Sequence, residues 1–102
     1  MSEDSQLLIP PSFIALYVPP GRIKPTLARD EIAQRYELCE DMAQMLTETA
    51  STMLVTLGIT EQDVLARCRL GLRAEPAVVS ADEAGWVVSR LAELMNWPAP
   101  LR

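Results

Sequence analysis

The chain has 102 residues, of which 49% are hydrophobic; this length fits one small domain, and the hydrophobic content excludes wholesale disorder. Its 9 basic and 14 acidic residues give a net charge of −5, which disfavours general phosphate binding because such binding needs clustered Lys and Arg. The sequence has no histidine, so the commonest general base and metal ligand near neutral pH is missing.

Residues 1–25 predict a polar tail followed by a proline-rich docking arm, and residues 26–102 predict a helical domain. Pro11 favours the start of a short helix from Ser12 to Val18, which the next proline pair would end. Several apolar side chains indicate that the arm docks, either on the chain's own helices or on a partner. They are Ile9, Phe13, Ile14, Leu16, Tyr17 and Val18.

The first residues are acidic where a signal peptide would be basic. No stretch approaches the roughly 18 uncharged apolar residues of a membrane span. These features predict a cytoplasmic protein without a membrane partner.

A long apolar column predicts one central α-helix over about residues 27–57. Its members recur at alternating steps of four and three, which keeps them on one side of a helix. They are Ile32, Tyr36, Cys39, Ala43, Leu46, Ala50, Met53 and Leu57. Thr26 is the expected N-cap, and Gly58 is placed to end the helix in a left-handed conformation.

Two shorter helices are predicted over about 61–74 and 81–96, each opened by a capping box. Thr60 with Asp63 forms the first box, and Ser80 with Glu83 forms the second. The fold class is therefore an all-α bundle around the long helix. Because each short helix covers only about half of the long column, we expect the arm to fold back, a homodimer, or both.

Candidate catalytic chemistry is sparse. The sequence contains no glycine-rich phosphate loop, and the two cysteines, Cys39 and Cys68, lie on apolar helix faces and are interpreted as buried thiols in a reducing compartment. A disulfide or metal pair is the alternative. Glu37, Asp41 and Glu48 share a face that we interpret as solvated, because the Glu-x-x-His pairs of diiron bundles are absent. We expect no cofactor, no metal and no catalysis.

Arg67, Arg69 and Arg73 form a candidate basic patch on the second helix. Arg69 and Arg73 are one turn apart and can present their charges together. Salt bridges to the acidic long helix are the favoured interpretation. Contact with DNA is the alternative, as in a reader that places such a helix in the major groove.

The aromatic residues and methionines are the candidate interaction surface. Trp86 and Trp97 fall opposite the apolar stripe of the last helix, which is typical of an interface, or of a surface that Phe13 or Tyr17 of the arm covers. Met42 and Met45 widen the stripe of the long helix and belong either to the core or to an adaptable binding surface.

Four runs carry a resemblance to a known family: Ile9 to Leu16, Gly21 to Pro25, Arg35 to Asp41 and Ala84 to Val87. In these runs the chain resembles a small family of uncharacterised proteobacterial all-helical proteins, some of which carry the label of an ATPase with chaperone activity. The resemblance implies a bacterial, cytoplasmic setting and no residue-level site. The sequence itself lacks a phosphate loop, so association with a larger ATPase fits it better than ATP hydrolysis.

Together these features predict a small cytosolic protein that acts by protein–protein contact, as an adaptor, an accessory factor or a self-associating subunit, with a homodimer expected. One alternative is a DNA-binding regulator that uses Arg67, Arg69 and Arg73. Another is a helical bundle that binds a small molecule between the arm and the surface of Met42 and Met45.

Overall fold

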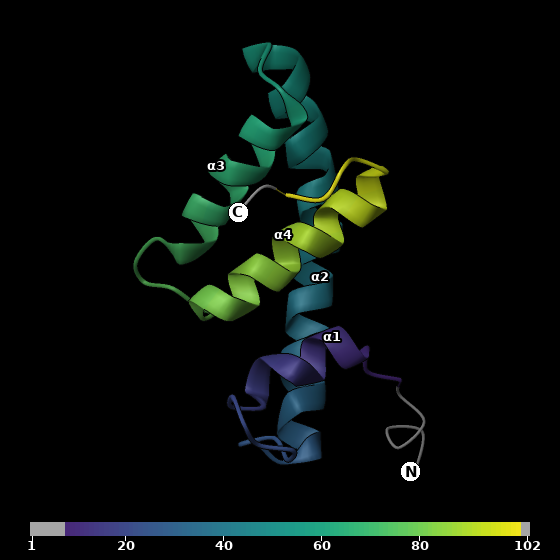
Figure 1. Ribbon diagram of the computed structural model, residues 1–102. Helices are drawn as coiled ribbons and strands as arrows, with labels where there is room; N and C mark the ends of the chain where they lie inside the picture. Colours follow the sequence, from purple (N-terminus) through teal and green to yellow (C-terminus); the bar gives the residue numbers. More distant parts are fainter. Residues whose placement is uncertain (1–7, 101–102) are drawn as a thin grey trace. The chain divides into compact units, whose positions relative to one another are not determined.

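The computed structural model describes residues 8–100, and within them every regular element is helical. The polar tail predicted at the N-terminus lies outside the described residues. The elements, in chain order, are α1 (Pro11–Ile14), the short 3-10 helix η2 (Ala15–Tyr17), α2 (Arg29–Leu57), α3 (Glu61–Arg73) and α4 (Ala81–Met95) (Figure 1). The predicted all-α fold with one long helix and two shorter C-terminal helices is confirmed.

The chain divides into two compact units, and the division falls within α2, between Leu38 and Cys39. We refer to the described residues up to Leu38 as the N-terminal unit and to those from Cys39 onward as the C-terminal unit. The boundary expected at residue 25 lies inside the N-terminal unit, because the arm packs with the first turns of α2 in that same unit.

The N-terminal unit is organised around the ring of Phe13, which is fully buried. Pro11 stands at the start of α1 as predicted, and the N–H group of Phe13 donates to the carbonyl oxygen of Pro10 at 3.0 Å. The Phe13 ring meets Tyr17 edge to face at 5.4 Å between centroids and meets Tyr36 of α2 at 5.6 Å. The arm therefore docks on its own chain.

The start of α2 differs from the prediction, because Thr26 is not its N-cap. The helix begins at Arg29, and the N–H group of Ala28 donates to Glu31 Oε1 at 3.1 Å. Thr26 instead fastens the end of the arm: its N–H and hydroxyl groups donate to the carbonyl oxygen of Tyr17 at 2.7 and 3.2 Å. A hydroxyl used in this way is not available to the helix.

The remaining helix boundaries in the C-terminal unit follow the sequence signals. Gly58 adopts a φ of 61° directly after α2, the left-handed conformation predicted for it. Both capping boxes are formed: Thr60 accepts from the N–H group of Asp63 at 3.0 Å, and Ser80 accepts from that of Glu83, also at 3.0 Å.

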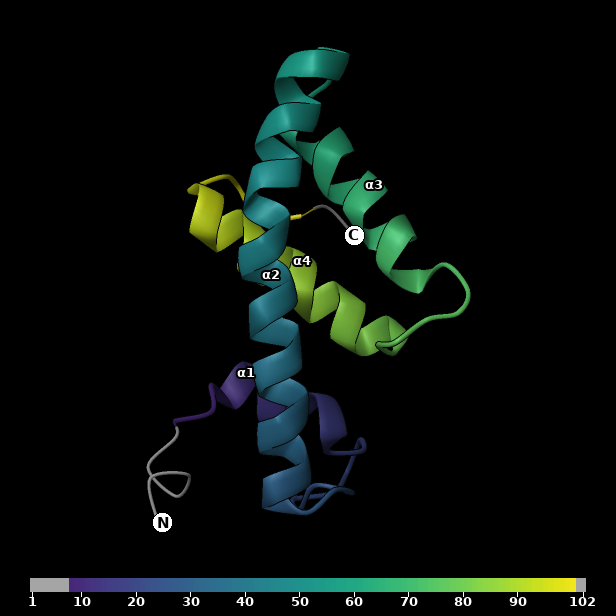
Figure 2. The ribbon, with the colours of Figure 1, turned by 180° about the vertical axis from the view of Figure 1, so that it is seen from behind.

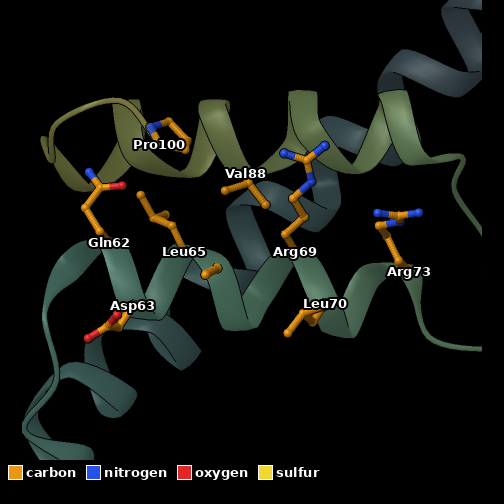
Figure 3. Close-up of a pocket in the computed structure, with 9 residues that line it drawn as sticks. Gln62, Asp63, Leu65, Arg69, Leu70, Arg73, Val88 and Pro100 are labelled. Atoms are coloured by element: carbon orange, nitrogen blue, oxygen red, sulfur yellow. The ribbon is translucent and has the colours of Figure 1, made fainter. Parts of the chain in front are cut away.

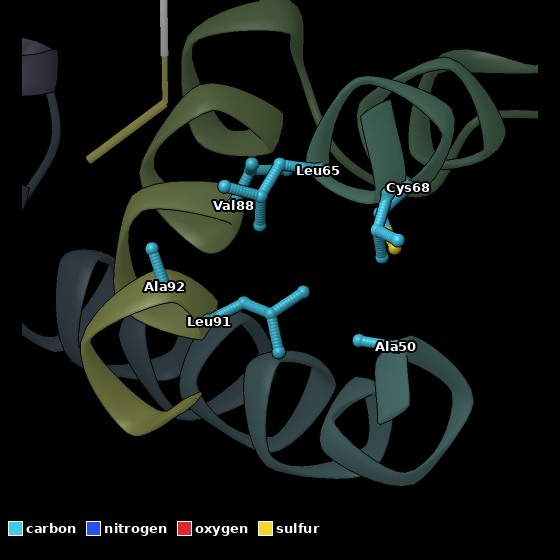
Figure 4. Packing of buried hydrophobic residues seen from close by; sticks show 7 residues of the cluster. Ala50, Leu65, Cys68, Val88, Leu91 and Ala92 are labelled. Atoms are coloured by element: carbon cyan, nitrogen blue, oxygen red, sulfur yellow. The ribbon is translucent and has the colours of Figure 1, made fainter. Parts of the chain in front are cut away.

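In the C-terminal unit, α3 runs back beside the later turns of α2, and α4 crosses the middle of α2 (Figure 1). The view from behind shows the same arrangement (Figure 2). The side chain of Leu91 points between the three helices, toward Ala50 and Cys68 (Figure 4). The buried cluster consists of Ala50, Val64, Leu65, Cys68, Val88, Leu91 and Ala92.

A paired arginine fixes α4 against α2. Arg90 Nε donates to Glu40 Oε1 at 2.8 Å, and Arg90 Nη2 donates to Glu40 Oε2 at 3.1 Å. The hydrogen bond from Arg90 is the main cause that lowers the pKa of Glu40, and the same bond raises the pKa of Arg90. The contact sets the position at which α4 crosses.

Candidate interaction site

A groove of about 480 Å³ lies along α3, between that helix and α4 (Figure 3). All of its residues belong to the C-terminal unit. The lining residues are Gln62, Asp63, Leu65, Ala66, Arg69, Leu70, Arg73, Val88 and Pro100.

The end of α4 helps to close this groove. Asn96 adopts a φ of 60°, and the N–H group of Trp97 donates to the carbonyl oxygen of Ala92 at 2.8 Å, which is the pattern of a Schellman motif. The chain then turns back, and Gln62 Nε2 donates to the carbonyl oxygen of Ala99 at 3.0 Å. This hydrogen bond holds Pro100 at the edge of the groove.

The base of the groove is apolar and its outer rim is exposed. Leu65 and Val88 are buried and belong to the core cluster. Leu70, in contrast, is 70% exposed and points away from α4 (Figure 3). A ligand seated here would meet apolar surface beneath it and a large free side chain at the rim.

Arg69 and Arg73 supply positive charge to the groove, and both extend toward α4 (Figure 3). A Cβ atom at Gly85 of α4 would lie 3.6 Å from Arg69 Nη2, an ordinary van der Waals distance, so the guanidinium lies beside Gly85 of α4. Within residues 8–100, no carboxylate lies within ion-pair distance of either arginine or of Arg67. Arg67 is not part of the lining.

The predicted salt bridges between these arginines and the acidic long helix are therefore wrong for the described residues. Arg90 of α4, which the sequence analysis left outside the patch, makes the contact with Glu40 instead. The reason is helix register: α3 turns its cysteine and leucine face to the core and leaves its arginines on the outside.

A second, shallower groove of about 430 Å³ lies on α2 itself, also in the C-terminal unit. It is lined by Glu48, Thr49, Thr52, Met53, Thr56 and Leu57. Two large apolar side chains on the outer side of the same helix segment are exposed: Met45 by 73% and Val55 by 81%. The last residue of the long apolar column, Leu57, is 48% exposed, so the column is not covered to its end.

The candidate aromatic surface is divided between different environments. Phe13 is buried, and its ring contacts those of Tyr17 and Tyr36. Trp97 lies outside α4 and packs against the core cluster, because the Schellman turn directs it back; it does not lie opposite the stripe. Trp86 and Tyr17 are half-buried.

The two methionines also separate. Met42 is half-buried and Met45 is exposed, and neither lines the two grooves described above. A small-molecule pocket between the arm and these methionines stays a prediction.

The described residues show little of the chemistry of a metal or thiol centre. Cys39 and Cys68 are buried and form no disulfide with each other, and burial raises the pKa of the Cys68 thiol, which lowers its thiolate fraction. Within residues 8–100, no group of three or more Cys, Asp or Glu side chains is placed to hold a metal ion. In the same residues, no helix is long and apolar enough to cross a membrane.

Comparison of the chain with protein-family models, curated proteins and solved structures finds no match. The resemblance to a proteobacterial family consequently stays a prediction.

Sequence reasoning found the arginines of the candidate site but missed the groove. The spacing of Arg69 and Arg73 was visible, whereas the position of Gly85 beneath Arg69 depends on how α4 packs on α3. The exposure of Leu70 had a sequence signal, since it lies opposite the Val64, Leu65 and Cys68 face of α3.

Proposed function

We propose that this protein acts by protein–protein contact, as an adaptor or accessory factor, and that the groove along α3 is its contact site. The observation that carries the proposal is the pairing of an exposed apolar side chain, Leu70, with two arginines that have no carboxylate partner among residues 8–100. No catalytic step of its own is part of the proposal.

The chemistry of the groove defines the partner it would prefer. Arginine presents a planar fork of donors that matches a carboxylate, so Arg69 and Arg73 favour an acidic segment. Exposed ion pairs contribute only about 0.2–1 kcal/mol each, whereas apolar burial contributes about 25 cal/mol per Å². A partner segment would therefore bind mainly through apolar side chains, and its acidic residues would set specificity and orientation.

Site-specific photo-crosslinking in native cells tests this assignment. A photoreactive side chain at Ala66, which lines the groove, should give a discrete crosslinked product. The same side chain at Ser89, an exposed position of α4 that lines neither groove, is the matched control.

The product at Ala66 should disappear when Arg69→Glu and Arg73→Glu are introduced together, because the groove then repels an acidic segment. Equal crosslinking at Ala66 and Ser89, or a product that persists in the double variant, would contradict the proposal.

Binding to DNA is a second candidate, favoured by one observation: Arg67, Arg69 and Arg73 are all exposed on α3 without an ion-pair partner among residues 8–100. The net charge of −5 weighs against it. Titration of a duplex at low salt decides, since a phosphate-binding helix must show salt-dependent affinity that falls on Arg→Ala substitution.

A further inference from the structure

We infer that the occupant of the groove along α3 is a second copy of this chain, which inserts the outer face of its own α2. This inference rests on the proposed function and names the partner of that site.

The outer face of α2 carries exposed apolar side chains and carboxylates. In the C-terminal unit it presents Asp41, Met45, Glu48, Thr52 and Val55, which recur at steps of four and three on the side opposite the buried column. Met45 and Val55 are 73% and 81% exposed. Exposed apolar side chains interleaved with carboxylates form an amphipathic ridge on the outer side of α2.

The charges on the two surfaces are complementary. From Cys39 to Leu57 the sequence has no Lys or Arg, and of its three carboxylates Glu40 is already bound to Arg90, which leaves Asp41 and Glu48. From Ala66 to Arg73 the sequence has no Asp or Glu but contains three arginines. The groove lining also includes Asp63, whose carboxylate accepts from the N–H group of Thr60 in the capping box.

Within residues 8–100, Asp41, Glu48, Arg69 and Arg73 make no ion pair. Each surface therefore carries the unmatched charge that the other one needs.

The shapes of the two surfaces also correspond. Leu70 projects from the rim of the α3 groove, and α2 carries the shallow groove whose lining includes Met53 and Leu57. In the proposed contact, Leu70 of one protomer seats in that depression of the other, and Glu48 lies on its border. Apolar burial and charge pairing then occur in one contact.

Because one chain carries both surfaces, two copies can exchange the same contact twice. In such an isologous dimer, α3 of one protomer meets α2 of its partner, and the reverse contact forms across the two-fold axis. An acidic ridge also suits this groove better than a nucleic acid does, since phosphates offer no apolar side chain to the exposed Leu70.

Complementary charge reversal is the test. One full-length variant carries Asp41→Lys with Glu48→Lys, and the other carries Arg69→Glu with Arg73→Glu. Each variant alone opposes like charges at both contacts, whereas an equimolar mixture restores opposite charges at both. All four side chains are exposed, so circular dichroism should show unchanged helicity.

Sedimentation velocity of the purified proteins gives the readout. The unchanged protein should dimerise, and each variant alone should bind itself about 30-fold more weakly or worse, given four lost pairs of roughly 0.5 kcal/mol. The mixture should dimerise again, and 0.5 M NaCl should weaken the unchanged dimer.

The control variant carries Arg22→Glu with Lys24→Glu in the exposed turn around Ile23 of the N-terminal unit. These substitutions change the net charge by the same amount as those of the α3 variant. It should dimerise like the unchanged protein.

The inference is overturned if the unchanged protein stays monomeric at several hundred micromolar, or if the mixture of the two variants does not associate. It is also overturned if the control variant, and not the α3 variant, abolishes the dimer. None of these results decides whether a different protein binds the groove, which the crosslinking at Ala66 measures separately.

Discussion

The two units of the chain use their apolar side chains differently. In the N-terminal unit the aromatic rings pack on one another, with Phe13 buried between Tyr17 and Tyr36. In the C-terminal unit three helices share a buried cluster, yet Met45, Val55 and Leu70 remain exposed at regular helical positions.

The N-terminal unit also exposes apolar residues, but these lie in irregular segments. Leu8 precedes α1, and Ile23, which is 94% exposed, lies in the turn between Arg22 and Lys24. A helix holds its exposed side chains at fixed spacing, which a partner helix can match, whereas a turn does not. A surface suited to docking is therefore distinguished by the regular spacing of its exposed apolar side chains more than by their number.

Removing the central ring should break the N-terminal unit. We expect Phe13→Ala to cost about 3–5 kcal/mol, because a buried ring and its two aromatic contacts are lost. Hydrogen exchange should show faster exchange in α1, η2 and the start of α2, with smaller changes in α3 and α4. Equal acceleration throughout would mean that the two units unfold as one.

Leu91→Ala is the corresponding change in the C-terminal unit. Leu91 is fully buried among residues of α2, α3 and α4, so we expect a cost of about 2–5 kcal/mol. Exchange should now accelerate in α3 and α4, the reverse of the pattern for Phe13→Ala. Unchanged protection in α3 would contradict the described packing.

The ion pair between Arg90 and Glu40 should make the C-terminal unit sensitive to acid. The pKa of Glu40 is lowered in the folded state, mainly by the hydrogen bond from Arg90, so its contribution is present above the ordinary carboxyl value of 4.5. This contribution is lost as the pH falls from about that value through the lowered pKa of the folded state.

Glu40→Gln removes the titrating group and should cost up to about 1 kcal/mol at pH 7, since the pair is partly exposed. Urea unfolding at pH 7 and pH 3 provides the measurement. The stability difference between the two proteins should shrink at the lower pH, and a constant difference would show that the pair does not contribute to stability.

Much of the fold was predictable because its signals are local. Gly58 and the capping boxes of Thr60 and Ser80 act over one helical turn, and each appears where the sequence places it. Thr26 and Trp97 were misplaced because their positions depend on tertiary contacts or a chain reversal: the Tyr17 carbonyl engages the first, and the turn at Asn96 redirects the second.

The candidate site was predictable only in part for the same reason. Arg69 and Arg73 could be placed on one helix face from their spacing, but the groove requires Val88 of α4 and the returning tail around Pro100. The choice of arginine that pairs with the acidic long helix also depends on how the helices pack. In the structure that arginine is Arg90.

The smallest effect on folding is expected for Leu70, the exposed apolar residue of α3. Leu70 is 70% exposed, so Leu70→Ser should change the free energy of unfolding by no more than about 0.5 kcal/mol. If its side chain is buried in the dimer, however, the same substitution removes apolar burial worth roughly 1.5–3 kcal/mol at each contact and should weaken association at least about tenfold.

Val78→Ser is the matched control, since Val78 is 61% exposed but lines neither groove. Urea unfolding of dilute monomer and sedimentation of concentrated protein separate the two quantities. If the Leu70 variant associates as well as the Val78 variant, the exposed side chain of Leu70 does not contact a partner. The contrast between the two units would then have no functional meaning.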